Sequence, residues 1–189
     1  MKLILASASP RRSELLQQIA VRFEVRAVDI DETPMKGESP MDYVNRLALE
    51  KARAVKHDCP ASDVLVLGSD TAVIVDGEIL GKPDDKQHTL TMLRKLSGKT
   101  HHVLTSVAVI GQQELFVVND NRVTFEKISE QDLQWYLSTG EWEGKAGGYA
   151  IQGKAAMFIS HLEGSFSGVM GLPLYETSQL LKRQGLVIA

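Results

Sequence analysis

Two arginines near the N-terminus stand where they could bind a phosphate group. Residues 3–6 form a short apolar run typical of a buried strand, and Ser9 followed by Pro10 is typical of a helix start. Arg11 and Arg12 would then fall in the first helical turn, where the positive end of the helix dipole disfavours a cation. A bound anion would relieve that conflict, because backbone N–H and guanidinium groups both bind phosphate oxygens. We predict an anion site at residues 9–12; the alternative is two solvated arginines behind an ordinary serine cap.

Asp70 is a candidate for acid–base or metal chemistry. It follows the most apolar run of the chain, residues 64–67, within Gly68-Ser69-Asp70-Thr71. We expect the strand to end at residues 68–70, which would place the carboxylate at a strand tip, where α/β proteins bind ligands. There Asp70 could serve as a general base or hold a divalent cation. From position alone, a simple strand-ending turn is an equally good interpretation.

A polar loop supplies a second acidic group. Asp29, Asp31 and Glu32 carry oxygens of the kind that Mg²⁺ binds. Taken alone, they are better interpreted as a solvated acidic loop.

Other basic residues could complete a phosphate site. Lys82 lies between Gly81 and Pro83 in a rigid turn, and Lys51 and Arg53 lie on a predicted helix. Such residues usually face solvent, so they matter only if the fold brings them near the candidate carboxylate.

Several other known binding motifs are not matched by the sequence. Residues 98–100 resemble the end of a P-loop, but Leu93 stands where its first glycine is needed. None of the five histidines has zinc-ligand spacing with Cys59. The chain lacks the Gly-x-Gly-x-x-Gly pattern, so a classical dinucleotide fold is not supported.

The elements that must position these residues alternate along the chain. Helices are predicted to begin at Pro10, Pro40, residues 84–85, residues 129–132 and Pro173. Strands are predicted at 3–6, 23–28, 64–67, 72–75, 78–80, 103–110, 115–118, 123–128 and 157–159, with an Asp76-Gly77 hairpin turn. This order predicts an α/β domain whose mixed sheet is flanked by helices.

Length and composition set further limits. The 189 residues suit one domain over 1–189 with two lobes and a central cleft. A net charge of −3 and an aromatic content of 6% speak against a protein drawn to nucleic acid by bulk charge and base stacking. The single cysteine cannot form an internal disulfide, and neither a signal peptide nor a membrane span is recognisable. We expect a cytoplasmic protein without nucleic-acid or membrane partners.

The ordered motifs together resemble the Maf family of nucleotide pyrophosphatases over essentially the whole chain. The matching segments are residues 5–16, 31–32, 47–52, 68–71, 81–83, 93–98 and 171–173. The resemblance implies a Maf/ITPase-like fold, cleavage of nucleoside triphosphates between the α and β phosphates, a divalent cation and a homodimer.

The resemblance also points to a branch of the family. Asp70-Thr71 and residues 146–153 resemble the branch that acts on dTTP and UTP, whereas the 7-methyl-GTP branch has Gln after the aspartate. It implies that Arg11, Thr71 and Gln152 govern the choice of base and that Asp70 accepts a proton. Ser69 is a departure, since some relatives have Ala there.

Together these observations give one hypothesis for the reaction. A dTTP/UTP pyrophosphatase, a hydrolase that cleans the nucleotide pool and acts also on modified pyrimidine nucleotides, needs a base, a cation and positive groups along the phosphates. The predicted catalytic base is Asp70, with Asp70 and Glu32 as ligands of Mg²⁺ or Mn²⁺. The predicted substrate-binding residues are Ser9, Arg11, Arg12, Lys51, Lys82, Thr71 and Gln152. The alternative is a non-enzymatic nucleotide-binding regulator of growth or division.

Overall fold

The computed structural model describes residues 1–188. The strands are β1 (Lys2–Leu5), β2 (Phe23–Val25), β3 (Val64–Val75), β4 (Glu78–Leu80), β5 (Thr100–Ile110), β6 (Glu114–Phe125) and β7 (Ile159–Glu163). The helices are α1 (Pro10–Gln18), α2 (Pro40–Asp58), α3 (Lys86–Leu96), α4 (Glu130–Ser138), α5 (Phe166–Met170) and α6 (Leu174–Arg183), with 3₁₀ turns η1 (Ala146–Gly148) and η2 (Lys154–Phe158). None of the helices in this described part is long and apolar enough to cross a membrane.

The strands form one mixed sheet in the order β2-β1-β3-β5-β6-β7, with β4 paired to β3. β1 pairs in parallel with β2 and β3, which places Leu3 opposite both Phe23 and Leu65. The pairs β3–β4 and β6–β7 are antiparallel. The predicted mixed sheet with flanking helices is therefore confirmed.

The chain divides into two compact units. The first comprises residues 1–70 and 105–119 and the described residues from 171 onward; the second comprises residues 71–104 and 120–170. The prediction of a single domain with two lobes and a central cleft stays a prediction.

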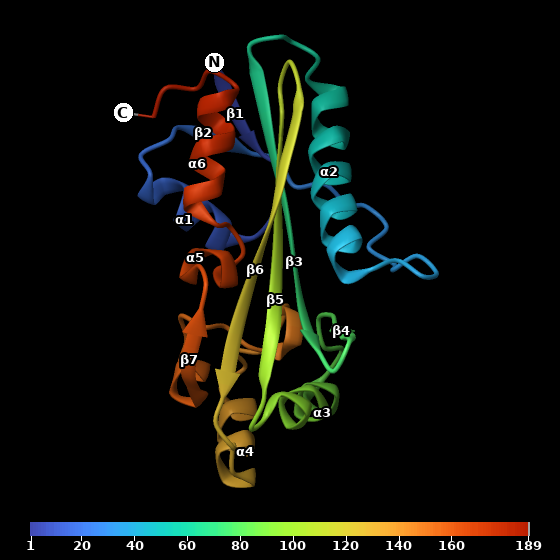
Figure 1. Cartoon of the computed structure of the whole chain (residues 1–189), viewed down its shortest axis with the longest axis vertical. Helices are drawn as coiled ribbons and strands as arrows, with labels where there is room; N and C mark the ends of the chain where they lie inside the picture. The colour runs from blue at the N-terminus through green and yellow to red at the C-terminus, as the bar shows by residue number, and fades with distance from the viewer. Residues whose placement is uncertain (189) are drawn as a thin grey trace. The chain divides into compact units, whose positions relative to one another are not determined.

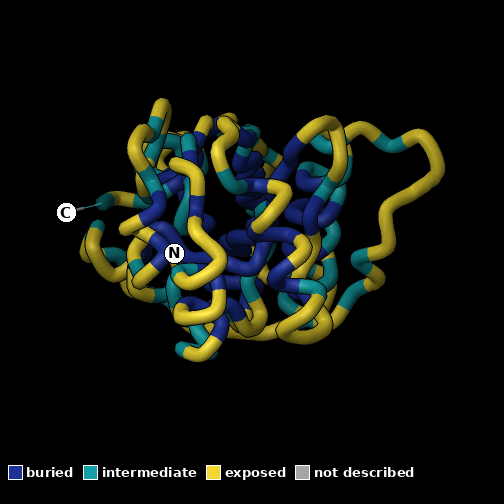
Figure 2. Tube along the Cα trace, turned by 90° about the horizontal axis from the view of Figure 1, so that it is seen from below, coloured by how far each residue is buried: buried dark blue, intermediate teal, exposed yellow. Residues whose placement is uncertain are grey.

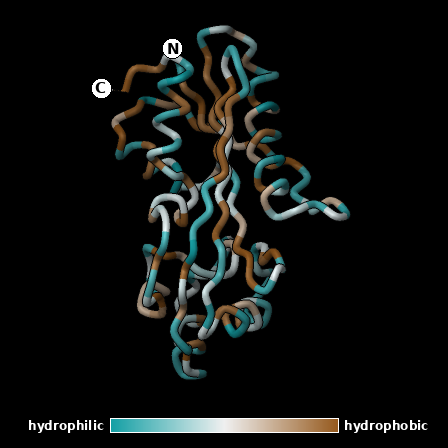
Figure 3. The backbone as a smooth tube through the Cα atoms, in the orientation of Figure 1, coloured by the Kyte–Doolittle hydropathy of each residue, from teal (hydrophilic) through white to brown (hydrophobic). Residues whose placement is uncertain are grey.

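In the first unit, helices cover both faces of the strands. Figure 1 shows α2 on one side of the strands and α1 and α6 on the other. α2 packs small and branched side chains, including Ala48, Ala52 and Val55, against Val64 and Val66 of β3. The strands of this unit are strongly hydrophobic (Figure 3), as expected for strands buried on both faces.

The second unit has a core of its own, which is rich in aromatic residues. Phe125, Tyr136, Tyr149 and Phe158 are buried in one apolar cluster, and their rings meet edge to face or tilted. Figure 2 shows the buried residues in the interior of the trace and the exposed residues along its loops.

The predicted end of the third strand at residues 68–70 is wrong, because β3 continues without a break to Val75. A glycine is required at position 68 because α2 lies very close to β3 there, and the chain does not turn at this residue. A Cβ atom at Gly68 would lie 2.2 Å from the carbonyl oxygen of Ala48 and 2.9 Å from the backbone nitrogen of Ala52. Glycine therefore lets α2 lie directly on β3, and Asp70 lies within the strand.

The predicted strands at 115–118 and 123–128 are one strand, β6. The polar residues between them suggested a break, but Asp120 and Arg122 are exposed and Asn121 finds partners inside the fold. Asn121 is fully buried, donates from Nδ2 to the carbonyl of Val103 at 3.1 Å and accepts the backbone N–H of Ser165 at 2.6 Å. A buried amide that is satisfied in this way is compatible with a continuous strand. The short strand predicted at 157–159 is also displaced, because β7 begins at Ile159.

Local signals at helix starts and at one turn are confirmed. Ser39 Oγ caps α2 by accepting from the backbone N–H of Asp42. Ser129 Oγ caps α4 by accepting from the backbone N–H of Asp132. The Asp76-Gly77 turn has positive φ at both residues, 52° and 80°, as a type I′ hairpin requires.

We expect Gly68→Ala to lower the free energy of unfolding by about 2 kcal/mol or more, since the added methyl group overlaps the backbone of α2. Gly81→Ala is the control, because a Cβ atom there meets nothing within 4 Å. Chemical denaturation of both variants provides the measurement. Wild-type stability in Gly68→Ala would show that the helix and strand are not in such close contact.

A second stability prediction concerns His101 in the second unit. This side chain is fully buried, bonds Tyr149 Oη through Nε2 at 2.7 Å, and packs edge to face against Phe125. Burial lowers the pKa of His101 to about 4, whereas its ordinary value is 6.5. The unfolded chain therefore takes up a proton at a higher pH than the folded protein, and stability is lost as the pH falls from 6.5 towards 4.

Lowering the pH from 7 to 5 should reduce the free energy of unfolding of His101→Gln by about 2 kcal/mol less than that of the wild-type protein. His102→Gln is the matched control, because the neighbouring side chain is partly exposed and pairs with Asp120. Urea titrations at the two pH values give the comparison. An identical pH dependence in wild type and His101→Gln would contradict the buried neutral imidazole.

Candidate active site

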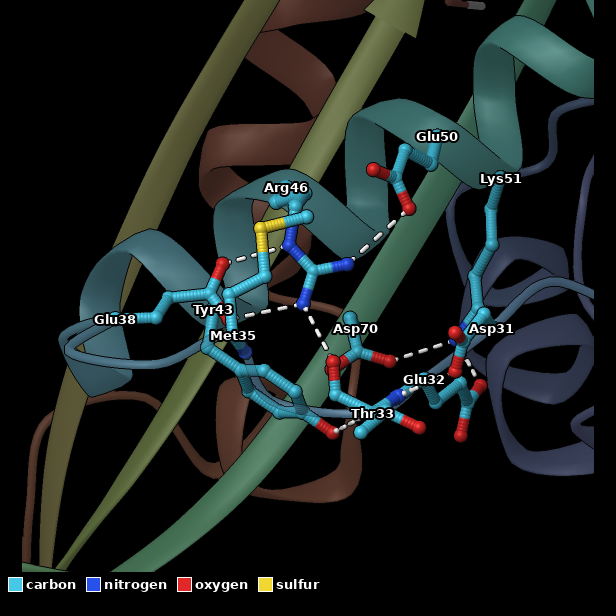
Figure 4. A network of polar contacts seen from close by, with 10 residues as sticks. All are labelled: Asp31, Glu32, Thr33, Met35, Glu38, Tyr43, Arg46, Glu50, Lys51 and Asp70. Atoms are coloured by element: carbon cyan, nitrogen blue, oxygen red, sulfur yellow. Dashed lines mark hydrogen bonds and ion pairs between the residues drawn. The ribbon is translucent and has the colours of Figure 1, made fainter.

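A lysine and two carboxylates meet on one face of the first unit. Lys51 Nζ lies 2.7 Å from Asp70 Oδ1 and 2.6 Å from Glu32 Oε1. Lys51 and Asp70 are both buried, with 8% and 7% of their surface exposed. Figure 4 shows the three side chains converging from α2, from β3 and from the loop that precedes α2. These three residues, which the sequence connected only through the family resemblance, thus form a single ionic cluster.

The periodicity of the two elements explains this meeting. Alternate residues of β3 face α2, so Asp70 follows Val66 and Gly68 on that face. On α2, Lys51 falls between Ala48 and Ala52 on the buried stripe. The close packing at Gly68 holds the lysine near the strand, where a carboxylate is the partner that a buried ammonium requires.

Opposing influences act on the carboxyl of Asp70. Burial raises the pKa of Asp70, while the positive charges of Lys51 and Arg12 act in the opposite direction and the charge of Glu32 adds to the rise. Burial is the largest influence. The pKa of Asp70 therefore lies above the ordinary aspartate value, which makes its carboxylate a better proton acceptor than a solvated one.

Arg12 is fixed beside this cluster. Its Nε donates to the carbonyl of Gly171 at 2.8 Å and its Nη1 to Ser7 Oγ at 3.1 Å. Ser69 Oγ donates to the same carbonyl at 2.9 Å, so Ser69 helps to anchor this part of the site. Burial lowers the pKa of Arg12 and the charge of Asp70 raises it; an arginine remains charged under such conditions.

The predicted anion site at residues 9–12 lies at the start of a helix, as expected. Ser9 is the N-cap of α1 and Pro10 its first residue, but the Ser9 side chain makes no capping hydrogen bond. The backbone N–H of Ser9 donates to Ser7 Oγ at 3.2 Å. Arg11 is half-buried in the first turn, which contains no acidic residue. A helix start that carries two arginines and no carboxylate suits an anion.

The acidic loop contributes only one of its three candidates. Asp31 is exposed, and its Oδ1 accepts the backbone N–H of Thr33 at 2.9 Å, a bond that holds the loop. Asp29 is exposed. Glu32 alone of the three pairs with Lys51. In the described part of the chain, no three His, Cys, Asp or Glu residues are grouped as a metal site would require; a cation would have two carboxylates, Asp70 and Glu32.

Three predicted site residues belong to the second unit. Thr71 is half-buried on β3, whereas Lys82 and Gln152 are exposed. The backbone N–H of Gly147 donates to the carbonyl of Gly81 at 3.0 Å, so the turn carrying Lys82 and the glycine-rich segment before Gln152 are joined within this unit. Arg53, an open candidate, is exposed and pairs with Glu114 at 2.6 Å on the surface.

The family model of Maf-like proteins matches residues 2–184. The chain belongs to the Maf family. The family expected from the motifs is confirmed.

Curated relatives of this Maf protein share about half of its residues. A dTTP/UTP pyrophosphatase of Myxococcus xanthus is 51% identical over 97% of this chain and 93% of that protein. A dTTP/UTP pyrophosphatase of Alkalilimnicola ehrlichii is 49% identical over 94% of this chain and 90% of that protein. Among solved structures, the Ham1 protein of Staphylococcus aureus matches with a TM-score of 0.49 at 14% identity, over 66% of this chain and 72% of that one.

The sequence did not point to the polar side chains that hold the loop before α2. Tyr43, Arg46 and Glu38 contact the segment that carries Glu32. The available signal was weak: Tyr43, Arg46 and Glu50 are spaced by three and four residues, which places them on one face of α2.

We expect Lys51→Met to lower the free energy of unfolding by about 3 kcal/mol at pH 8, because a buried carboxylate loses its partner. Loss of the positive charge raises the pKa of Asp70 further, so folding favours the protonated acid and stability falls as the pH rises. The destabilisation should therefore be smaller at pH 5 than at pH 8.

Lys56→Met is the matched control on the same helix. Lys56 Nζ donates to the carbonyls of Ala61 and Val64, which are neutral acceptors. Its loss should cost the same stability at both pH values. An equally pH-independent cost in Lys51→Met would contradict the coupling between Lys51 and Asp70.

Proposed function

We propose that this Maf protein hydrolyses dTTP and UTP to the nucleoside monophosphate and pyrophosphate. The observation that carries the assignment is the identity of about half of all residues with relatives named dTTP/UTP pyrophosphatase, 51% and 49% over nearly the whole chain. The buried cluster of Lys51, Asp70 and Glu32 supports a hydrolytic site at this place. Modified pyrimidine nucleotides belong to the same proposed substrate class.

In the proposed mechanism, Asp70 is the general base. The oxygen of a water molecule attacks the α-phosphorus, and the bond from that phosphorus to the α–β bridging oxygen breaks. The proton of the water passes to the carboxylate of Asp70, and pyrophosphate leaves with the bridging oxygen. Burial raises the pKa of Asp70, which supports this role.

The remaining predicted residues would bind the substrate. Ser9, Arg11 and Arg12 at the start of α1 suit phosphate oxygens, since backbone N–H groups and guanidinium groups both donate to them. Lys51 and Lys82 would add positive charge along the triphosphate.

Recognition of the base is assigned to the second unit. Thr71 and Gln152 offer the donors and acceptors that a pyrimidine edge needs. This part of the proposal rests on the family resemblance.

A divalent cation, Mg²⁺ or Mn²⁺, would be held by Glu32 and Asp70. Two carboxylates fit such a cation when substrate phosphates supply further oxygens, and the pairing of both carboxylates with the Lys51 ammonium supports this assignment. The cation would neutralise charge on the phosphate oxygens. A homodimeric, cytoplasmic enzyme without nucleic-acid or membrane partners completes the proposal, and this part rests on the resemblance and the composition.

The reaction is tested by incubating the protein with Mg²⁺ and each canonical or modified triphosphate. We expect release of pyrophosphate, fastest from dTTP and UTP. Release of orthophosphate would contradict the bond assignment, a preference for 7-methyl-GTP would contradict the branch, and binding without turnover would favour the regulator.

For the base, we expect Asp70→Asn to lower kcat by roughly two to four orders of magnitude. Asp76→Asn is the control, because Asp76 is an exposed residue in the hairpin turn that follows the same strand. Circular dichroism establishes that both variants fold. Near-normal turnover by folded Asp70→Asn would remove this carboxylate from the reaction.

A further inference from the structure

The loop that carries Glu32 is fastened to α2 by Arg46. The guanidinium binds Glu38 through two bonds, Nε to Oε1 at 2.6 Å and Nη2 to Oε2 at 2.9 Å. Nη2 also donates to the carbonyl of Thr33 at 3.1 Å, and Nη1 reaches Glu50 at 3.3 Å. One side chain thus joins two points of the loop to the helix (Figure 4).

Tyr43, one helical turn earlier, holds the loop at Glu32 itself. Its hydroxyl donates to the backbone carbonyl of Glu32 at 3.0 Å. Burial raises the pKa of Tyr43 to about 12, and the negative charges of Asp70 and Glu32 act in the same direction. The phenol therefore keeps the proton that it donates. The guanidinium of Arg46 lies over the tyrosine ring at 5.7 Å, so the two residues also contact each other.

Two internal hydrogen bonds brace the loop, one across Glu32 and one after it. The backbone N–H of Thr33 donates to Asp31, and that of Met35 donates to Glu38 Oε2 at 3.0 Å. The Glu38 side chain is 8% exposed, and the bonds from Arg46 are the largest cause of its pKa being lowered to about 2. The pairing with Arg46 therefore favours the ionised form of Glu38, which is the form that fastens the loop.

We propose that Tyr43 and Arg46 are positioning residues that hold the carboxylate of Glu32 against Lys51 and Asp70. The proposal rests on the role that the proposed function gives to Glu32, since fastening the loop matters for turnover only through that carboxylate. Neither residue contributes to the apolar face of α2, and the helix has its own cap at Ser39. The contacts of Tyr43 and Arg46 thus serve the loop more than the helix.

The same helix offers a matched control. Arg53 makes a comparable two-bond pair with Glu114, at 2.9 and 2.6 Å, but joins α2 to β6 and not to the loop. Arg53→Met therefore removes an equivalent ion pair from α2 without releasing Glu32.

The first measurement is hydrogen–deuterium exchange of residues 31–38 in the nucleotide-free protein. Arg46→Met should raise the exchange rate of these amides about tenfold or more, Tyr43→Phe should raise it less, and Arg53→Met should leave it unchanged. Unchanged exchange in Arg46→Met would overturn the fastening. Because no turnover is needed, this outcome is separate from any failure of the wild-type protein to release pyrophosphate.

The second measurement asks whether Arg46 acts through Glu32. Arg46→Met should lower kcat/KM about ten- to a hundredfold and raise the half-saturating Mg²⁺ concentration, as loss of an outer partner of a metal ligand does. In a Glu32→Gln background the same substitution should change kcat/KM by less than about twofold. Equal losses in both backgrounds, or a wild-type Mg²⁺ dependence in Arg46→Met, would overturn the positioning role.

Discussion

The structure of the first unit depends on the burial of one ammonium group between two carboxylates. Lys51 lies on the apolar face of α2, where an unpaired charge would be strongly destabilising. Asp70 and Glu32 compensate that charge at 2.7 and 2.6 Å. The close contact at Gly68 holds the helix near the strand, and the loop before α2 brings the second carboxylate. The packing of α2 on β3, the conformation of the loop and the proposed chemistry therefore all depend on the pairing of Lys51 with these two carboxylates.

This arrangement reconciles an acidic chain with a polyanionic substrate. The net charge of −3 excludes only binding that relies on bulk charge. In the first unit, Arg12 is held by a carbonyl and a hydroxyl, and no carboxylate occupies the first turn of α1. A few fixed cations at a helix start would be sufficient to attract phosphate oxygens, as the proposed function requires, whereas Arg53 is paired with Glu114 on the surface.

The sequence predicted those features that depend on neighbouring residues. The serine caps of α2 and α4, the Asp76-Gly77 turn and the alternation of strands and helices are local patterns, and the structure has them. The end of β3 was predicted wrongly because Gly68 serves a distant contact with α2, which no local pattern reveals. Likewise, the polar stretch in β6 suggested a break because the partners of Asn121 are far away in sequence. The resemblance pointed to Glu32 and Lys51 as separate site residues, but their pairing and the fastening by Arg46 depend on the folded loop, and the sequence predicted neither.

The role of Asp70 as a base is tested most directly by titrating its carboxyl group in the nucleotide-free protein, with NMR detection at the carboxyl carbon. Burial of Asp70 outweighs the attraction of Lys51 and Arg12 for its negative charge, which leaves a carboxylate that readily accepts a proton. We therefore expect a titration midpoint above that of an ordinary aspartate. A midpoint below the ordinary value would show that the ion pair dominates, and Asp70 would then be a counter-ion of Lys51 and no longer a base.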